Sequence, residues 1–386
     1  MKKIKLAVVF GTRPEAIKMA PVVLQMKKYA DFVEPFVVVT AQHREMLDQV
    51  LNLFKIKPDF DLNIMSSRQT LFDITCRALT GLDEVFTKIT PDMILVHGDT
   101  TTTFAAALAA YYKQIPVGHV EAGLRTGNLL SPFPEEANRH LTGVLANFHF
   151  APTKTAENNL LKENICGKKI FITGNTVIDA LKQTVEENYQ FDSGVLSSCV
   201  KSGRRIILVT THRRENLGEP LRCIYRALRK IVETYDDVEV VFPVHKNPLV
   251  QEMAKEELGD IQRVHLVDPL DYQPFANLMA KAYLVLSDSG GLQEEAPALG
   301  KPVLVLRDTT ERPEAVKAGT VKLVGTDSEE IFSSASKLLD DKHLYQKMSE
   351  AINPYGDGFA AQRIIETILY EKKLIQTAPT YFCSDY

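Results

Sequence analysis

The chain contains twelve short runs rich in valine, isoleucine and leucine, and each run is followed by a polar or glycine-containing segment. Six runs lie in each half of the chain, from IKLAVVF at the amino terminus to TVKLVGT in the second half. Continuous apolar runs of this kind are typical of parallel strands whose two faces are both covered by helices. Ligands of such sheets bind outside the carboxyl ends of the strands. We therefore expect the functional residues in the segments that follow the runs.

Stretches with helical periodicity fill the gaps between the runs, for example at residues 14–30, 101–114, 135–148, 220–235 and 329–341. Alternating strands and helices with short connections are typical of right-handed βαβ units. A chain of 386 residues also exceeds the size at which a single core stops growing. The sequence therefore predicts an α/β protein with two Rossmann-like doubly wound domains that face each other across a cleft.

The domain limits follow from where the composition changes. We predict an amino-terminal Rossmann-like domain over residues 1–175 and a carboxyl-terminal one over residues 176–361. The composition loosens once, near residues 188–205, and we expect the hinge between Thr173 and Arg205. Residues 362–386 are expected to form a helix that packs back across the domain boundary, followed by a loose tail.

Composition excludes several classes of protein. The net charge of −4 argues against broad nucleic-acid binding, which requires a basic face. No apolar run approaches the roughly 20 residues of a membrane helix, and the amino-terminal run ends in Gly-Thr-Arg-Pro, so we interpret it as the first strand and not as a signal peptide. The five cysteines show no C-x-x-C spacing, which indicates reduced thiols in the cytoplasm and neither a disulfide framework nor a zinc site.

The first strand is followed by Gly-Thr-Arg-Pro-Glu, which opens a helix. A helix amino terminus with Arg13 and Lys18 nearby suits a pyrophosphate or a sugar. The alternative is an ordinary turn whose charges are solvated. The chain contains no GxGxxG dinucleotide fingerprint, so we expect no nicotinamide cofactor, and we expect no metal.

Three carboxylates lie where strands of the first half end or the next helix begins: Asp99, Glu121 and Glu135. Burying acids at strand ends is costly unless they are paired or used. Converging carboxylates can act as general acid and general base at one sugar carbon. The alternative is structural, with Asp99 capping the helix that follows and Glu135 or Glu136 favouring a helix dipole.

Cationic and glycine-rich segments follow strands of the second half. His212, Arg213 and His245 are donors suited to a diphosphate, whose departure requires neutralisation of developing charge. In Ser-Asp-Ser-Gly-Gly, Ser289, Gly290 and Gly291 form a turn into a helix where backbone amides can approach phosphate oxygens.

Five further side chains belong to this half. Glu295, about one turn into the helix after the two glycines, suits ribose hydroxyls. Arg307 and Arg312 are expected to add charge at the phosphate end, and Phe275, with Tyr272 nearby, either stacks a base or fills the core.

Ten motifs together carry a family resemblance: GTRPEAIKMAP, TAQHREMLDQVL, VHGDTTTT, PVGHVEAGLRTG, PEEANR, FITGNTVIDAL, HRREN, PVHKNP, DSGGLQEEAP and RDTTERPEA. In this order and spacing they resemble the non-hydrolysing UDP-N-acetylglucosamine 2-epimerases of bacteria. The resemblance implies the glycosyltransferase-B fold and a cytoplasmic homodimer that feeds cell-surface polysaccharide synthesis. It also implies interconversion of UDP-N-acetylglucosamine and UDP-N-acetylmannosamine, by anti elimination of UDP to 2-acetamidoglucal and re-addition.

The resemblance also assigns roles to residues. Asp99, Glu121 and Glu135 would exchange the proton at carbon 2. The positions that match the UDP-sugar site are Arg13, Lys18, His212, Phe275, Ser289, Gly290, Gly291, Glu295 and Arg312. A second site for UDP-N-acetylglucosamine as an activator would involve Gln42, His43 and Gln69, with His245 nearby; from the residues alone, Gln42 and His43 are equally a polar wall of the cleft or a helix start.

Three alternatives stay open. A glycosyltransferase of the same fold would share the nucleotide site, but it rarely needs three acids around one carbon. A hydrolysing epimerase would release UDP and free N-acetylmannosamine, and the absence of a fused kinase domain favours the non-hydrolysing type. A non-catalytic sensor of UDP-sugars would give no product.

Overall fold

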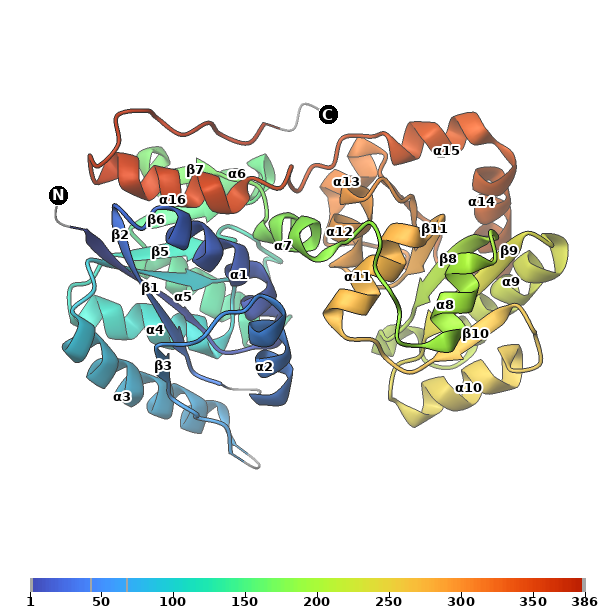
Figure 1. Cartoon of the computed structure of the whole chain (residues 1–386), viewed down its shortest axis with the longest axis horizontal. Coiled ribbons are helices and arrows are strands. Elements are labelled where there is room, and N and C mark those ends of the chain that lie inside the picture. Colours follow the sequence, from blue (N-terminus) through green and yellow to red (C-terminus); the bar gives the residue numbers. More distant parts are fainter. Residues whose placement is uncertain (1–2, 42–43, 67–68, 384–386) are drawn as a thin grey trace. The chain divides into compact units, whose positions relative to one another are not determined.

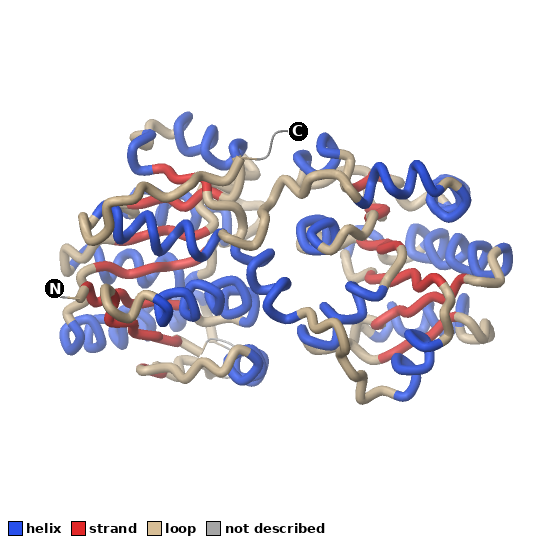
Figure 2. The backbone as a smooth tube through the Cα atoms, turned by 45° about the horizontal axis from the view of Figure 1, so that its top comes forward, coloured by secondary structure: helices blue, strands red, loops and turns tan. Residues whose placement is uncertain are grey.

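The computed structural model describes residues 3–41, 44–66 and 69–383, and these contain two separate sheets flanked by helices (Figure 1). The chain divides into two compact units. Unit 1 comprises Met1–Lys182 together with Tyr355–Asp385, and unit 2 comprises Gln183–Pro354. In each unit helices cover both faces of the sheet (Figure 2).

The sheet of unit 1 is parallel, with the strand order β3-β2-β1-β4-β5-β6-β7. Its strands are β1 (Ile4–Phe10), β2 (Val33–Val39), β3 (Phe60–Asp61), β4 (Met93–His97), β5 (Val117–Val120), β6 (Phe148–Ala151) and β7 (Ile170–Ile172). The helices of this unit are α1 (Arg13–Lys28), α2 (Arg44–Leu53), α3 (Leu71–Ile89), α4 (Thr101–Tyr112), α5 (Glu135–Leu145), α6 (Lys154–Lys162), the single turn η1 (Gly167–Lys169) and α16 (Ala360–Glu371). Helix α7 (Thr176–Thr184) contains the boundary to unit 2.

The sheet of unit 2 has the corresponding order, β10-β9-β8-β11-β12-β13, and is also parallel. Its strands are β8 (Arg205–Thr210), β9 (Val238–Pro243), β10 (Val264–Val267), β11 (Leu284–Ser287), β12 (Val303–Val305) and β13 (Val321–Leu323). Its helices are α8 (Gly194–Lys201), the turn η2 (Arg214–Asn216), α9 (Glu219–Thr234), α10 (Pro248–Leu258), α11 (Tyr272–Lys281), α12 (Leu292–Ala298), α13 (Pro313–Ala318), α14 (Ser328–Asp340) and α15 (Lys342–Ser349).

Both sheets reverse their strand order at one place, between β1 and β4 in unit 1 and between β8 and β11 in unit 2. This is the Rossmann-type order, and its reversal leaves a crevice outside the carboxyl ends of the two strands, where ligands of such folds bind. The predicted α/β class with two doubly wound, Rossmann-like units is confirmed, and all twelve predicted runs form strands. The structure adds β3, a two-residue edge strand that pairs only with the end of β2.

The strands form because their side chains are buried on both faces. Residues 6–10 of β1 and 93–97 of β4 are all buried, as are 206–209 of β8. Valine and isoleucine suit this environment because their branched side chains pack well on a pleated surface. Most of the helices are amphipathic by contrast, and the alanines of α4 allow it to pack closely against both α3 and α5.

Helix α16 belongs to unit 1, where it packs against α1. Its amino terminus is held by Asp179 of α7, which accepts hydrogen bonds from the backbone amides of Ala360 and Ala361 at 3.2 and 2.8 Å. Burial raises the pKa of Asp179 to about 6, against the lowering effect of these two amides.

The segment near residues 188–205, where the composition loosens, contains α8, whose cap Ser193 accepts a hydrogen bond from the Leu196 amide. The tail expected to be loose packs on unit 1: the Phe382 amide donates to the Ile172 carbonyl at 2.9 Å, and the ring of Tyr381 stacks on Phe171. Both segments are mostly polar in sequence, so the few apolar side chains that pack against the rest of the unit form no recognisable pattern.

Gly123 is the tightest glycine next to the predicted acids. Its φ of +90° disfavours any other residue, and a Cβ here would lie 2.3 Å from the backbone oxygen of Ala156 in α6. We expect Gly123→Ala to destabilise the protein by about 1–3 kcal/mol, because the backbone cannot move aside as a flexible side chain would. Gly194→Ala is the matched control, since a Cβ there meets nothing within 4 Å. Thermal unfolding of both variants checks this; equal melting temperatures would contradict it.

Candidate active site

The switch point of unit 1 is lined by the segments that follow β1, β4 and β5. They contain Gly11, Gly98 with Asp99, and Glu121, respectively. Because the three strands are neighbours in the sheet, their carboxyl ends lie at one edge. The structure thus brings two of the three predicted acids, Asp99 and Glu121, to the edge where a ligand is expected.

Glu121 is a buried carboxylate with several polar neighbours. It forms an ion pair with Lys18 of α1 and accepts a 2.8 Å hydrogen bond from the Asn175 side chain. Its backbone has a φ of +61°, the left-handed region that non-glycine residues rarely occupy and that is frequent at functional sites. Burial alone would raise the pKa of Glu121, but Lys18 and His97 hold that pKa well below its usual range. Glu121 is therefore ionised.

His97 is a residue of this site that sequence reasoning missed. It is the last residue of β4, is buried, and its Nε2 lies 3.6 Å from a carboxylate oxygen of Glu121, just outside hydrogen-bonding distance. In the sequence it is the end of an apolar run, which is the usual pattern of a core histidine. Only its position at the switch point distinguishes it.

A second histidine fixes the turn that carries Asp99. His119 on β5 contacts the carbonyl of Gly98 through Nε2 at 2.7 Å. Burial lowers the pKa of His119 to about 3, so the ring is neutral. Since a carbonyl can only accept, Nε2 carries the proton, and the ring serves to hold the Gly98 turn, whose φ is +66°.

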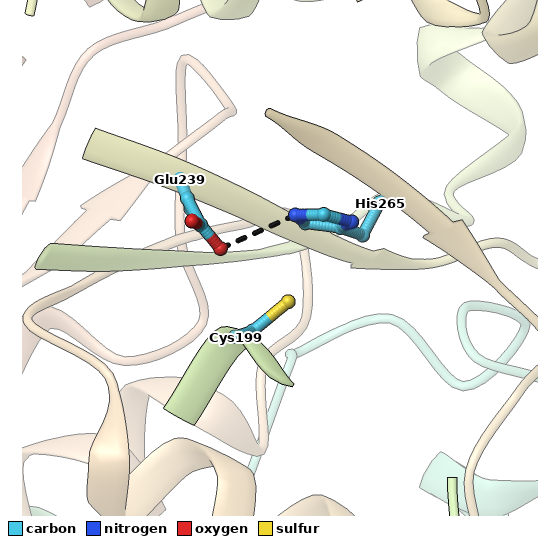
Figure 3. Close-up of side chains that lie close together, drawn as sticks. All are labelled: Cys199, Glu239 and His265. Carbon is cyan, nitrogen blue, oxygen red and sulfur yellow. Dashed lines mark hydrogen bonds and ion pairs between the residues drawn. The ribbon is translucent and has the colours of Figure 1, made fainter. Parts of the chain in front are cut away.

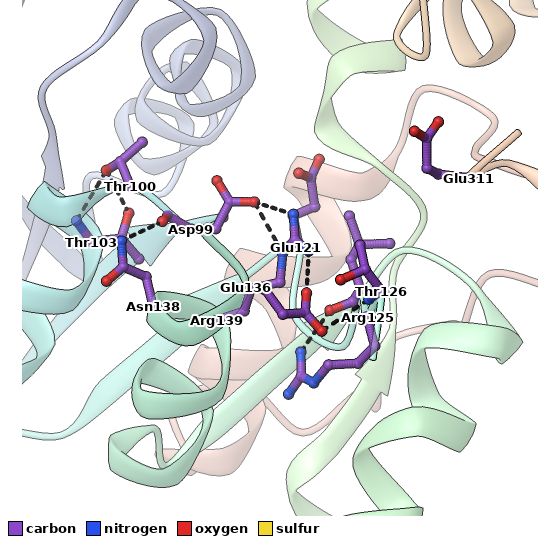
Figure 4. A network of polar contacts seen from close by, with 12 residues as sticks. Asp99, Thr100, Thr103, Glu121, Arg125, Thr126, Glu136, Asn138, Arg139 and Glu311 are labelled. Carbon is purple, nitrogen blue, oxygen red and sulfur yellow. Dashed lines mark hydrogen bonds and ion pairs between the residues drawn. The ribbon is translucent and has the colours of Figure 1, made fainter. Parts of the chain in front are cut away.

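Asp99 belongs to a network that includes α5 (Figure 4). One of its carboxylate oxygens accepts two hydrogen bonds from Arg139, at 2.6 and 3.0 Å. Arg139 also contacts Glu136, which is fully buried and accepts the backbone amides of Thr126 and Gly127. Glu136 is thus a structural anchor. The alternative of a simple helix cap does not describe Asp99, because Thr100 is the residue that caps α4.

Glu135, the third predicted acid, is the first residue of α5 and is half-buried. It precedes the anchor Glu136, so the network around Arg139 fixes its backbone. Arg139 itself was not singled out from the sequence, although it follows Glu136 at the i+3 spacing at which side chains on a helix meet.

The turn after β1 is held by a buried carboxylate, Glu15. Its Oε2 accepts the amides of Gly11 and Thr12 at 3.0 and 2.8 Å, and its Oε1 accepts the hydroxyls of Thr100 and Thr103. The pattern Thr-x-x-Glu before an apolar stretch is the sequence signature of such a cap. Glu15 therefore shapes the turn and is unavailable as an acid.

Arg13 and Lys18, predicted to bind substrate, both lie on α1 and are half-buried. Arg13 is the first residue of the helix, at its positive end. Lys18 lies one turn further on and reaches Glu121. A cation next to the acid would neutralise an anionic substrate group and would also keep Glu121 ionised.

The switch point of unit 2 is organised by Asp288, which directly follows β11. This fully buried carboxylate accepts the backbone amides of His212 and Arg213, both at 2.9 Å, and a hydrogen bond from Asn216. Its other oxygen lies 3.0 Å from Nδ1 of His212. Burial raises the pKa of Asp288, but the hydrogen bonds from His212 and Arg213 outweigh burial and keep that pKa below its ordinary value.

This arrangement fixes the orientation of His212. Because an ionised carboxylate can only accept, Nδ1 of the ring donates to Asp288, which leaves Nε2 for a ligand. The His212 side chain is 41% exposed although its partner is completely buried. The ring of His245, which follows β9, stacks on it at 6.3 Å between centroids. The structure therefore brings together these two predicted histidines.

Ser289, Gly290 and Gly291 connect β11 to α12. The Ser289 amide donates to the hydroxyl of Ser287, and the turn remains partly exposed. Glu295, one turn into α12, is half-buried and accepts a 3.2 Å hydrogen bond from the Tyr272 hydroxyl. Tyr272 and the half-buried Phe275 both lie on α11, so this helix supplies the predicted aromatic side chains.

The two arginines of the RDTTERPE segment have carboxylate partners. Arg312 forms an ion pair with Glu294, which is buried in α12. Arg307 is buried and contacts Glu215 at 2.7 Å and Glu311 at 2.8 Å. Burial of Arg307 between two carboxylates indicates that it holds this loop to the segment after β8.

The described residues include only part of the predicted activator site. Gln42 and His43 lie outside the described residues. Gln69 is half-buried, precedes the cap of α3, and its side-chain oxygen accepts the Ser66 amide at 3.2 Å.

The model of a protein family described as UDP-N-acetylglucosamine 2-epimerase matches residues 25–369. The UDP-N-acetylglucosamine 2-epimerase of Bacillus subtilis is 59% identical over 382 residues, which cover 99% of each chain. This chain belongs to the UDP-N-acetylglucosamine 2-epimerase family.

Solved structures agree with this assignment. The UDP-N-acetylglucosamine 2-epimerase from Neisseria meningitidis bound to UDP-N-acetylglucosamine is similar with a TM-score of 0.83 and 52% identity, covering 95% of this chain and all of the other. The co-structure of S. aureus MnaA with UDP is similar with a TM-score of 0.88 and 50% identity, covering 99% and 100%. This chain thus has the glycosyltransferase-B fold, as predicted. Within its described residues no helix is long and apolar enough to cross a membrane.

Proposed function

We propose that this epimerase-family protein interconverts UDP-N-acetylglucosamine and UDP-N-acetylmannosamine without releasing free sugar. The observation that carries the proposal is the pair of carboxylates Glu121 and Asp99 at the switch point of unit 1, each held by a cation. The family membership and the relatives that were solved with UDP or UDP-N-acetylglucosamine support the substrate class.

The chemistry explains why carboxylates are sufficient. The proton on carbon 2 is too weakly acidic for a carboxylate to remove unaided. Departure of UDP from the anomeric carbon builds positive charge next to carbon 2 and acidifies this proton. Anti elimination then gives UDP and 2-acetamidoglucal, and re-addition of UDP with protonation of carbon 2 on the opposite face gives the epimer. Acid and base groups on both faces of the ring are needed.

The residues divide these tasks between the two units. Glu121 is ionised and serves as a proton acceptor, and Asp99 and Glu135 complete the exchange. In unit 2, the Ser289–Gly291 turn and Nε2 of the partly exposed His212 side chain bind the diphosphate and stabilise its negative charge as the bond breaks. Arg213 and Arg312, also in unit 2, add positive charge for the same anion, and Arg13 of unit 1 is a further substrate-binding residue. Neither metal nor nicotinamide takes part in this scheme.

Incubation with UDP-N-acetylglucosamine and separation of the products tests the function. We expect UDP-N-acetylmannosamine to accumulate with no free sugar. Free N-acetylmannosamine with UDP would indicate a hydrolysing epimerase. An unchanged substrate would contradict both, and would favour a glycosyltransferase that lacks its acceptor or a UDP-sugar sensor.

We further propose activation by UDP-N-acetylglucosamine at a second site that includes Gln69. The reverse reaction from UDP-N-acetylmannosamine alone should then start slowly and accelerate about 5- to 150-fold when a trace of UDP-N-acetylglucosamine is added, the range expected of typical coupling energies. Gln69→Ala should remove the acceleration and preserve UDP affinity. A linear initial rate in the unsubstituted protein would contradict activation.

We also propose that the protein is a cytoplasmic homodimer and that its product supplies cell-surface polysaccharide synthesis. The exposed side chains of Tyr111 and Tyr112 on α4 and of Leu141 and Val144 on α5, two helices that pack together, provide an apolar face suited to a second copy. Sedimentation velocity distinguishes a dimer from a monomer.

A further inference from the structure

Three side chains in unit 2 that have no part in the proposed reaction converge at one place (Figure 3). They are Cys199 of α8, Glu239 of β9 and His265 of β10. One ligand atom from each, the thiol sulfur, a carboxylate oxygen and a ring nitrogen, lies within 4.8 Å of the other two. We propose that these residues form a binding site for a zinc ion, with three protein ligands and one position left for water.

The donor set determines which cation fits. A thiolate, an imidazole and one carboxylate are the ligands that zinc takes in proteins, whereas magnesium and calcium take oxygen ligands only. Zinc bond lengths of about 2.0–2.3 Å in a tetrahedron imply ligand separations of about 3.3–3.6 Å. The Glu239 oxygen and the His265 nitrogen already have about this separation, so it is the Cys199 sulfur that must approach them, which rotation of the cysteine side chain can supply.

The charges and contacts around Glu239 suit this role. One carboxylate oxygen lies 3.2 Å from Nε2 of His265, so this oxygen and this nitrogen already face each other. The other oxygen accepts a 2.7 Å hydrogen bond from Arg204. Arg204 would keep that oxygen while the first binds the metal, and would orient the carboxylate as residues behind metal ligands commonly do.

The burial of the three side chains is also compatible with a bound zinc ion. Cys199 and Glu239 are buried, and His265 is half-buried, so a cation can enter from the histidine side. Burial and the neighbouring Glu239 raise the pKa of the Cys199 thiol to about 12, which means that Cys199 is protonated without a metal. Binding must therefore release the thiol proton: Zn²⁺ forms a bond to sulfur and the S–H bond breaks.

The site lies away from the nucleotide-binding segments of unit 2. Glu239 and His265 are the second residues of β9 and β10, whereas His245 follows the carboxyl end of β9. His245 lies six positions after Glu239 along β9 and its extension, which is about 20 Å at the usual rise per residue of a strand. The ion would therefore tie α8 to β9 and β10 and stabilise unit 2 without contacting the substrate.

Cobalt(II) is the probe for the test, because a thiolate bound to it gives a charge-transfer absorption band. The full-length protein, freed of metal with a chelator, is titrated with Co²⁺ and then with Zn²⁺. We expect a thiolate band that saturates at one equivalent, disappears when Zn²⁺ displaces Co²⁺, and is accompanied by release of one proton. Melting temperature should rise with Zn²⁺ concentration.

Variants assign the ligands. Cys199→Ser and the partly exposed His265→Gln should each abolish the thiolate band, and Arg204→Gln should weaken binding by about 10- to 100-fold. Cys223→Ser, which alters a cysteine of α9 outside the cluster, should bind as the unsubstituted protein does. Absence of the band in the unsubstituted protein, or its persistence in His265→Gln, would overturn the proposal. Turnover of UDP-N-acetylglucosamine should be unaffected in Cys199→Ser, so the outcome is independent of the proposed reaction.

Discussion

Glu121→Gln should reduce kcat by about 10²–10⁴, the range in which removal of a general acid or base usually falls. The amide keeps the size of the side chain and can still accept from Asn175, but it cannot take up the proton from carbon 2. Asp99→Asn and Glu135→Gln should fall in the same range, since each removes one proton-exchanging group. Steady-state kinetics with both UDP-sugars would measure the losses.

Two controls separate chemistry from structure. Glu84→Gln changes an exposed carboxylate on α3 in the same unit and should retain full activity. UDP affinity, measured by calorimetry, should change little in the three amide variants, because the diphosphate site is proposed on unit 2. Near-normal turnover in all three would show that these acids are structural.

Glu295→Ala should weaken UDP binding about 10- to 150-fold. Loss of a hydrogen-bonding partner of a ligand costs about 1.5–3 kcal/mol when one group is charged, and this is the corresponding change in dissociation constant. Arg312→Ala should act in the same direction, but it also leaves the buried Glu294 without its cation. Glu295 is therefore the cleaner test of the nucleotide site.

Tyr272→Phe is the matched control for Glu295. It removes the hydroxyl that donates to Glu295 and keeps the ring, so UDP affinity should change by much less than in Glu295→Ala. Calorimetry with UDP on both variants measures this. Unchanged UDP affinity in Glu295→Ala would show that the nucleotide does not bind at α12.

The strands and main helices could be predicted from the sequence because burial on two faces leaves a pattern in the chain itself. The runs of valine, isoleucine and leucine identified twelve strands with their polar ends. β3 was not predicted, because it consists of Phe60 and Asp61, which pair with Val38 and Val39, and two residues are too few to show an apolar run. Helix α8 was not predicted, because serines and a glycine surround its few apolar residues.

Some of the site residues could likewise be predicted from the sequence, and others could not. Acids at strand ends, such as Asp99 and Glu121, are conspicuous because burial without a partner would be costly. The partners themselves are not conspicuous. His97 looks like a core residue, and Arg139 looks like an exposed cation on a helix. The same limit applies to Asp288, which anchors His212 although the two residues lie 76 positions apart in the sequence.

The cluster of Cys199, Glu239 and His265 shows why spacing rules have a limited reach. These rules detect metal ligands that lie close together in sequence. Here three elements supply one ligand each, and only the pairing of β9 with β10 and the position of α8 bring them together.

The most direct test of the proposed epimerisation is proton NMR of the reaction run in deuterated water. Elimination removes the proton from carbon 2, and the acids exchange it with solvent before re-addition, so the UDP-N-acetylmannosamine formed should carry deuterium at carbon 2. The carbon 2 proton signal of the product should be absent while the anomeric proton signal remains. Product that retains its original hydrogen at carbon 2, or a requirement for added nicotinamide cofactor, would contradict the elimination mechanism.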